Sequence, residues 1–188
     1  LLPLLMGLPI IFWPIHIAFL EMIIDPVCSL VFEAEVEERD VMKRPPRRPD
    51  APLFTWTLIA WSLLQGGLVF GVVASVYLAA LYNGAPDAEA RAMAFFSLVA
   101  TIICLILVNR SFSTSLLRAL SRPNPALAWV VLGVAGILAL SLFWSEAAQL
   151  FHFGPLHAGD LALTAAVFLG LLAILEALKF LLASRLKF

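Results

Sequence analysis

The amino-acid sequence predicts an all-α protein, a polytopic membrane helix bundle with five full transmembrane helices and the stub of a preceding one. Hydrophobic residues make up 62% of the chain and charged residues 13%, whereas soluble domains are about a quarter charged. The mean hydropathy is +0.99. The 188 residues suffice for about five spans of roughly 20 residues each. A soluble fold has no place for this much apolar surface, so we expect residues 1–188 to form a single transmembrane domain.

Five apolar runs, each bounded by proline, glycine or charged residues, mark the expected helices. We place them at residues 15–33, 54–82, 92–109, 126–145 and 160–181. Residues 1–6 resemble the end of an earlier span that is turned back by the sequence GLPIIFWP. The polar segments 34–53 and 110–125 are then loops on one side of the membrane.

Lysine and arginine are distributed unevenly between the two sides of this predicted bundle. Eleven of the twelve fall on one side if the five spans alternate, and only Arg91 falls on the other. The eleven are Arg39, Lys43, Arg44, Arg47, Arg48, Arg110, Arg118, Arg122, Lys179, Arg185 and Lys187. By the positive-inside rule, the loops 34–53 and 110–125 and the C-terminus are predicted to be cytoplasmic.

Two acidic residues, Glu21 and Asp25, lie midway along the first predicted span. Residues four apart share one face of a helix, so the two carboxylates converge. Charges at this depth cost about 2.5–3.5 kcal/mol each to insert, and a bound cation, a proton or a polar cavity must offset that cost. We interpret the pair as coordinating an ion or handling protons. The alternative is a structural pair that shares a proton and faces a neighbouring helix.

Pro26 directly follows the second acid. It has no N–H for the carbonyl of Met22, and its ring presses on that carbonyl, so the helix should break or kink here. Carboxylate and carbonyl oxygens are the ligands that hard cations prefer, and transporters hold ions at broken helices. The candidate cation ligands, and the candidate metal site, are therefore Glu21 and Asp25, with the main-chain carbonyl of Met22.

The remaining polar residues of the spans and outer loops give weaker signals. Thr101 and Asn109, on the third full span, could add ligands, although hydrogen bonding between helices is their ordinary role. His157 lies in a predicted outer loop that offers too few further ligands in sequence for a metal site. The basic residues 44–48 are typical of a solvated turn, and we expect no nucleic acid as a partner.

The first fifty residues resemble a known family. The stretch GLPIIFWPIHIAFLEMIIDPVCSLVFEAEVEERDVMKRPPRRPDAPLF is similar to the region around the sixth membrane helix of P-type cation pumps, especially the calcium-pump branch. Three features carry the resemblance: the turn at residues 7–9 before Pro14, the central Asp25, and the loop sequence DVMKRPPR. The later spans are similar in spacing and length to the seventh through tenth helices.

The resemblance implies roles for particular residues. Asp25 falls on the ion-binding aspartate of the family, and Glu21 falls where calcium pumps usually have an asparagine ligand. Ile24 stands where many have a threonine, and Pro26 replaces a common glycine. The stretch SLVATIICLILVN has no acid where some calcium pumps have a ligand glutamate. The expected site is therefore rich in oxygen and loads one ion per cycle, with calcium favoured.

The resemblance also implies a larger protein. The sequence contains no Asp-Lys-Thr-Gly motif, so we expect no catalytic residue in this fragment, and ATP and magnesium should bind only in upstream domains. The chain would be the membrane part of an ATP-driven translocase in a bacterial plasma membrane. Its partners would be the lipid bilayer and the upstream membrane helices and cytoplasmic catalytic domains of the same pump. The alternative is a free-standing polytopic protein, such as a secondary cation/proton transporter or an accessory bundle.

Overall fold

The computed structural model describes residues 5, 7, 10–35, 42, 46, 54–110 and 124–182. Helices make up this part of the chain, and no strand occurs within it. The elements are α2 (Pro14–Pro26), the π-helix η1 (Val27–Val31), α3 (Trp56–Tyr82), α4 (Asp87–Asn109), α6 (Pro125–Phe143), α7 (Ser145–Leu150) and α8 (Ala158–Leu182).

Among the described residues, five helical segments are long and apolar enough to cross a membrane, if α2 and η1 are counted as one. The predicted all-α helix bundle is thus confirmed. Most of the predicted stub at residues 1–6, and most of the loops 34–53 and 110–125, lie outside the described residues. α4 begins at Asp87 rather than at residue 92, and the short helix α7 was not expected.

Local chemistry explains where the helices begin and end. The Thr55 hydroxyl accepts a hydrogen bond from the Leu58 N–H at the start of α3. In the same way, the Asn124 side chain accepts from the Leu127 N–H at the start of α6. These are N-cap bonds, which satisfy backbone donors that have no partner within the helix. α3 is followed by Gly84 at φ +80°, a conformation that glycine adopts without strain.

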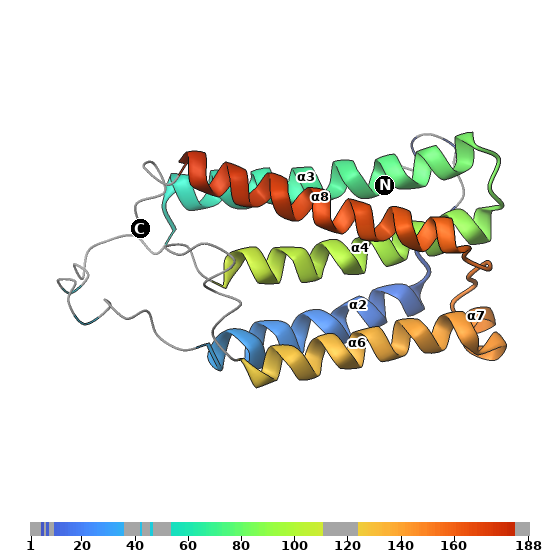
Figure 1. Cartoon of the computed structure of the whole chain (residues 1–188), viewed down its shortest axis with the longest axis horizontal. Helices are drawn as coiled ribbons and strands as arrows, with labels where there is room; N and C mark the ends of the chain where they lie inside the picture. Colours follow the sequence, from blue (N-terminus) through green and yellow to red (C-terminus); the bar gives the residue numbers. More distant parts are fainter. Residues whose placement is uncertain are drawn as a thin grey trace.

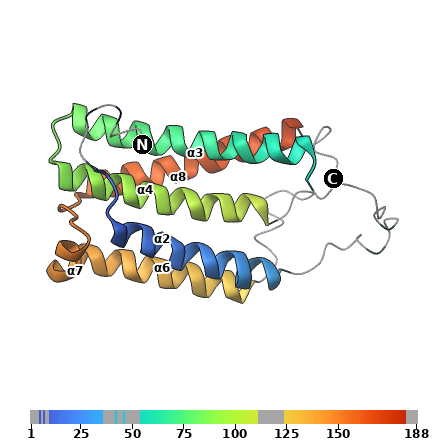
Figure 2. The ribbon, with the colours of Figure 1, turned by 180° about the vertical axis from the view of Figure 1, so that it is seen from behind.

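Consecutive spans run in opposite directions along the bundle (Figure 1). We call the end at which α4 stops and α6 begins the Arg110 end, and the other, which carries α7, the α7 end. In both views α3 and α8 lie on one side of α4, and α2 and α6 lie on the other (Figure 2). The alternation predicted from the cation count is therefore present among the described helices.

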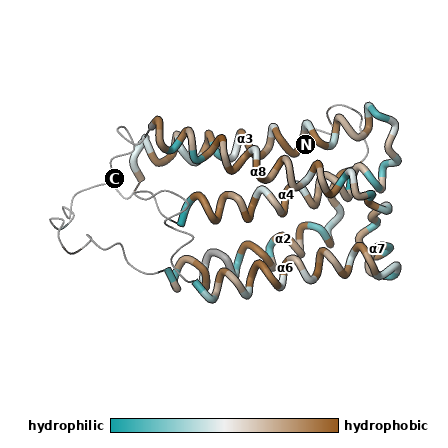
Figure 3. Tube along the Cα trace, in the orientation of Figure 1, coloured by the Kyte–Doolittle hydropathy of each residue, from teal (hydrophilic) through white to brown (hydrophobic). Residues whose placement is uncertain are grey.

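α4 is the central helix of the bundle. Of the membrane-spanning stretch of α4, 61% of the residues are buried, compared with 11% in α8 and 25% in the α2–η1 segment. Its residues take part in three apolar clusters: Phe95 packs with α2 and α6, Cys104 with α3 and α8, and Met93 with α3. The other spans are apolar along most of their length (Figure 3), although the α2–η1 span carries Glu21 and Asp25 near its middle. Their outward faces are suited to lipid or to further membrane helices.

Candidate cation site

The two acidic residues of α2 lie on the face that turns away from the bundle. Glu21 and Asp25 are exposed, and so is Met22. On the opposite face, Phe19 and Ile23 are buried against α4 and α6. Within the described part of the chain, neither carboxylate has a side-chain partner. The four-residue spacing predicted that the two carboxylates would share a face of the helix. Because α2 packs on the bundle through its other face, this acidic face is not covered by the described helices.

The helical form changes directly after the acidic pair. α2 ends at Pro26 and continues as the π-helix η1 without an intervening loop. The Ser29 hydroxyl donates to the main-chain carbonyl of Asp25 at 2.6 Å, so this carbonyl keeps a partner. Short π-helical turns often occur at functional sites, because they alter the direction of side chains and carbonyls over a few residues. The role of the Met22 carbonyl as a ligand stays a prediction.

Thr101 and Asn109 do not join the acidic pair. Thr101 is fully buried, and its hydroxyl donates to the Leu98 carbonyl of its own helix at 2.8 Å. Asn109 forms two hydrogen bonds with Gln65 of α3, at 3.1 and 3.2 Å. The reciprocal amide pair satisfies both side chains and ties α4 to α3. The ordinary role of such residues, hydrogen bonding within or between helices, therefore accounts for both positions.

A polar cluster fixes the chain at the Arg110 end, just beyond η1. Arg110 forms an ion pair with Glu35, with two N–O contacts at 2.8 and 3.1 Å. The Asn124 amide donates to the Glu35 carboxylate at 2.9 Å and to the Val31 carbonyl at 3.0 Å. Three chain segments, from α2–η1, α4 and α6, meet here. This cluster was not expected from the sequence, because the hydrogen-bonded partners within it are 75 to 93 residues apart.

At the α7 end, an aromatic cluster holds the start of α2. His16 is fully buried, and its Nδ1 accepts a hydrogen bond from the Trp13 N–H at 2.9 Å. Its ring packs among Phe12, Phe95, Phe151 and Phe153. Aromatic pairs at such separations stabilise beyond the area they bury. Both ends of the α2–η1 segment are thus held by side chains from other helices, and its acidic middle is open.

A second open face lies on α3. A groove of about 400 Å³ is lined by Gly67, Leu68, Gly71, Val72, Ser75, Val76 and Val167. A Cβ built on Gly66, Gly67 or Gly71 would meet no atom within 4 Å. Small residues on a membrane helix allow another helix to approach closely. The described chain therefore leaves the acidic face of α2 and the glycine face of α3 uncovered, along with the outward faces of α6 and α8.

Comparison with known proteins gives a consistent result. Residues 9–181 match the family described as "Cation transporting ATPase, C-terminus". The chain is 28% identical to the "Calcium-transporting ATPase" of Bacillus subtilis over 162 residues, which cover 85% of this chain and 18% of that protein. It is 32% identical over 129 residues to the "Probable cation-transporting ATPase F" of Mycobacterium tuberculosis H37Rv and of Mycobacterium bovis, covering 69% of this chain and 14% of each. The chain thus spans less than a fifth of the length of these relatives.

Proposed function

This chain belongs to the family of cation-transporting ATPase C-terminal domains, and from that premise we propose that it supplies half of the intramembrane cation site of an ATP-driven pump. The ligands are Glu21 and Asp25, with the main-chain carbonyl of Met22. The observation that carries the proposal is the exposure of both carboxylates on one face of α2, within a membrane span.

The free energy of inserting the two carboxylates supports this assignment. Each ionised carboxylate facing lipid at this depth would cost about 2.5–3.5 kcal/mol. The opposite face of α2 packs on the bundle through Phe19 and Ile23, so the described helices do not cover the acidic face. Other protein must therefore cover the acidic face, and a cation must neutralise it. Upstream membrane helices of the same pump are the natural cover, and they would also fill the glycine groove of α3.

The ligand chemistry favours a hard divalent cation, with calcium first. Two carboxylates balance the charge of one divalent ion, and carboxylate and carbonyl oxygens are the donors that calcium prefers. The relative from Bacillus subtilis carries calcium transport in its name. Since the proposed half site supplies two carboxylates, which balance one divalent ion, one ion per transport cycle is the stoichiometry that we propose. ATP and magnesium would act in cytoplasmic catalytic domains of the same pump, in a bacterial plasma membrane.

The test is the exchange of Asp25 for asparagine in the intact pump. Asp25→Asn keeps the size of the side chain but removes a charge that the ion must balance, so cation-stimulated ATP turnover should be lost. The fold should tolerate the change, because an amide inserts more readily than a carboxylate. Glu33→Gln is the matched control, since Glu33 is an exposed acid shortly after η1 and should leave turnover unchanged. Normal cation-stimulated turnover in Asp25→Asn would refute the assignment.

A further inference from the structure

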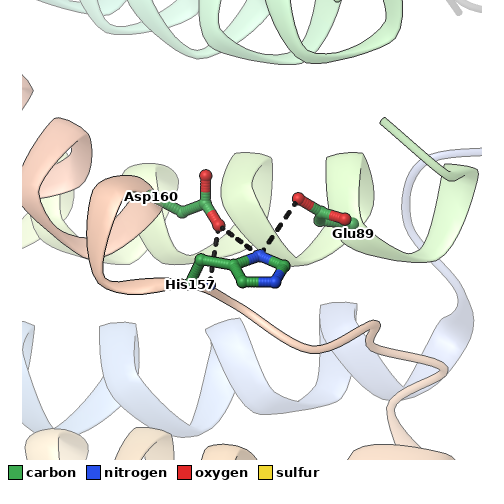
Figure 4. Close-up of side chains that lie close together, drawn as sticks. All are labelled: Glu89, His157 and Asp160. Atoms are coloured by element: carbon green, nitrogen blue, oxygen red, sulfur yellow. Dashed lines mark hydrogen bonds and ion pairs between the residues drawn. The ribbon is translucent and has the colours of Figure 1, made fainter. Parts of the chain in front are cut away.

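Three side chains of types that can bind a metal, Glu89, His157 and Asp160, lie close together (Figure 4). Glu89 comes from the first turn of α4, and His157 and Asp160 come from the start of α8. The Nδ1 atom of His157 lies 3.7 Å from a Glu89 carboxylate oxygen and 3.5 Å from an Asp160 carboxylate oxygen. One potential ligand atom from each residue lies within 4.8 Å of the other two.

The loop that carries His157 is fixed against the first turn of α4. The Gly154 N–H donates to the Ala88 carbonyl at 2.9 Å, and a Cβ on Gly154 would lie 2.7 Å from the backbone nitrogen of Glu89. Arg91 donates to the His152 carbonyl at 2.8 Å. Only glycine permits this close approach. The three ligands are therefore brought together by backbone packing and not by their own attraction alone.

Helix capping accounts for a part of this arrangement. Asp160 accepts a hydrogen bond from the His157 N–H at 2.7 Å, as in a capping box. A carboxylate in the first turn of α4 or α8 is also favoured by the helix dipole. Helix capping does not bring a carboxylate from a second helix to the same imidazole nitrogen, and the two carboxylates repel each other there. A cation between them would offset that repulsion.

We propose that Glu89, His157 and Asp160 form a binding site for a divalent transition metal of the zinc type. Imidazole nitrogen combined with carboxylate oxygen suits zinc, cobalt or nickel, whereas calcium takes oxygen ligands. Ligand atoms around a tetrahedral zinc ion are about 3.4 Å apart, given bonds of about 2.0–2.2 Å. The two His157 contacts are close to this spacing, and the third separation, which is within 4.8 Å, would shorten when the metal binds.

The burial of the three residues fits an open metal site. The side chains of Glu89 and Asp160 are 17% and 19% exposed, and that of His157 is 73% exposed. The metal can therefore enter from solvent, and water can serve as the fourth ligand. A bound ion joins the first turn of α4 to that of α8. From the sequence, His157 has too few ligands nearby for a metal site; in the structure, Glu89 of another helix lies beside it.

The test measures zinc binding to the intact pump, purified in detergent, by competition with a chromogenic chelator. The parent for this experiment is the pump with Asp25→Asn, which removes a ligand of the proposed transport site, and every variant is made in this background. The parent should bind one equivalent of zinc that His157→Ala and Glu89→Gln bind at least about tenfold more weakly. Cobalt at the site should give a visible absorption band in the parent that both variants lose.

Two control variants test whether the effect is specific. Asp87→Asn changes another acid of the first turn of α4, and His152→Asn removes the neighbouring imidazole at a positive φ that asparagine tolerates. Both should bind zinc as the parent does. If the parent binds no zinc beyond what His157→Ala and Glu89→Gln bind, the proposal is wrong and the three side chains form only an ion pair of protonated histidine. That outcome would leave the assignment of the transport site to Asp25 untouched.

Discussion

The middle of the α2–η1 segment and its two ends are built in opposite ways. At the Arg110 end, Glu35 has an arginine and an asparagine as partners. At the α7 end, the buried His16 is enclosed by aromatic rings. Between them, Glu21 and Asp25 are exposed and have no side-chain partner in the described part of the chain.

This difference distinguishes polar residues that the fold itself satisfies from polar residues that the described chain leaves open. A charged or polar group that serves only the fold is paired within it, as Glu35 is, because burial without a partner costs free energy. In our proposal, the two acids left open at mid-span bind a cation together with protein outside the described residues. Because contacts at both ends fix the α2–η1 segment, its two exposed carboxylates would be held at a fixed position for an ion and for further helices. The predictions below disturb first one end, then the other, then the middle.

The largest loss of stability should follow from breaking the ion pair at the Arg110 end. Arg110→Ala leaves Glu35, whose side chain is only 15% exposed, without its arginine. Removing one partner of a buried pair costs about 3 kcal/mol. We expect the free energy of unfolding in mixed micelles to fall by that amount. The double variant Arg110→Gln/Glu35→Gln should lose less than Arg110→Ala alone, since no charge is left unpaired; an equal or larger loss would show that the charge pairing is unimportant.

A smaller loss should follow from enlarging Gly154 at the α7 end. In Gly154→Ala the new Cβ meets the backbone of Glu89 at 2.7 Å, and backbone cannot yield as a flexible side chain would. The loop that carries Phe151 and Phe153 should move away from His16, at a cost of about 1–3 kcal/mol. Gly159→Ala is the matched control, because its Cβ meets nothing within 4 Å. Equal melting temperatures for the two variants would contradict the close approach.

Local patterns in the sequence predicted a large part of this architecture. Hydropathy marked all five spans, because each must present some twenty apolar residues to lipid. The four-residue spacing of Glu21 and Asp25 predicted their common face. Hydropathy placed the start of α4 too late, since Asp87 and Glu89 are polar and nevertheless favourable in a first helical turn. Hydropathy averaged over a stretch of residues does not detect a helix that begins with polar residues.

Contacts between distant segments were beyond such reasoning. Nothing near Glu35 in the sequence indicates that Arg110 and Asn124 will reach it. The same holds for Glu89 and His157, which meet because Gly154 packs on the first turn of α4. The interhelical role of Asn109 was anticipated, but its partner Gln65 was not. Which polar residues are satisfied by the fold, and which are left for a ligand, follows only from the packing of the helices.

The central claim, that the open acidic face of α2 binds the transported cation, is tested most directly by cation binding and transport in Glu21→Gln. The amide keeps an oxygen donor, so the intact pump should bind calcium about tenfold more weakly, which corresponds to about 1.4 kcal/mol, and should still transport it. Equilibrium binding of radioactive calcium and uptake into vesicles measure the two quantities. A Glu21→Gln pump with unchanged calcium affinity and no transport would contradict the claim and assign Glu21 to proton transfer instead.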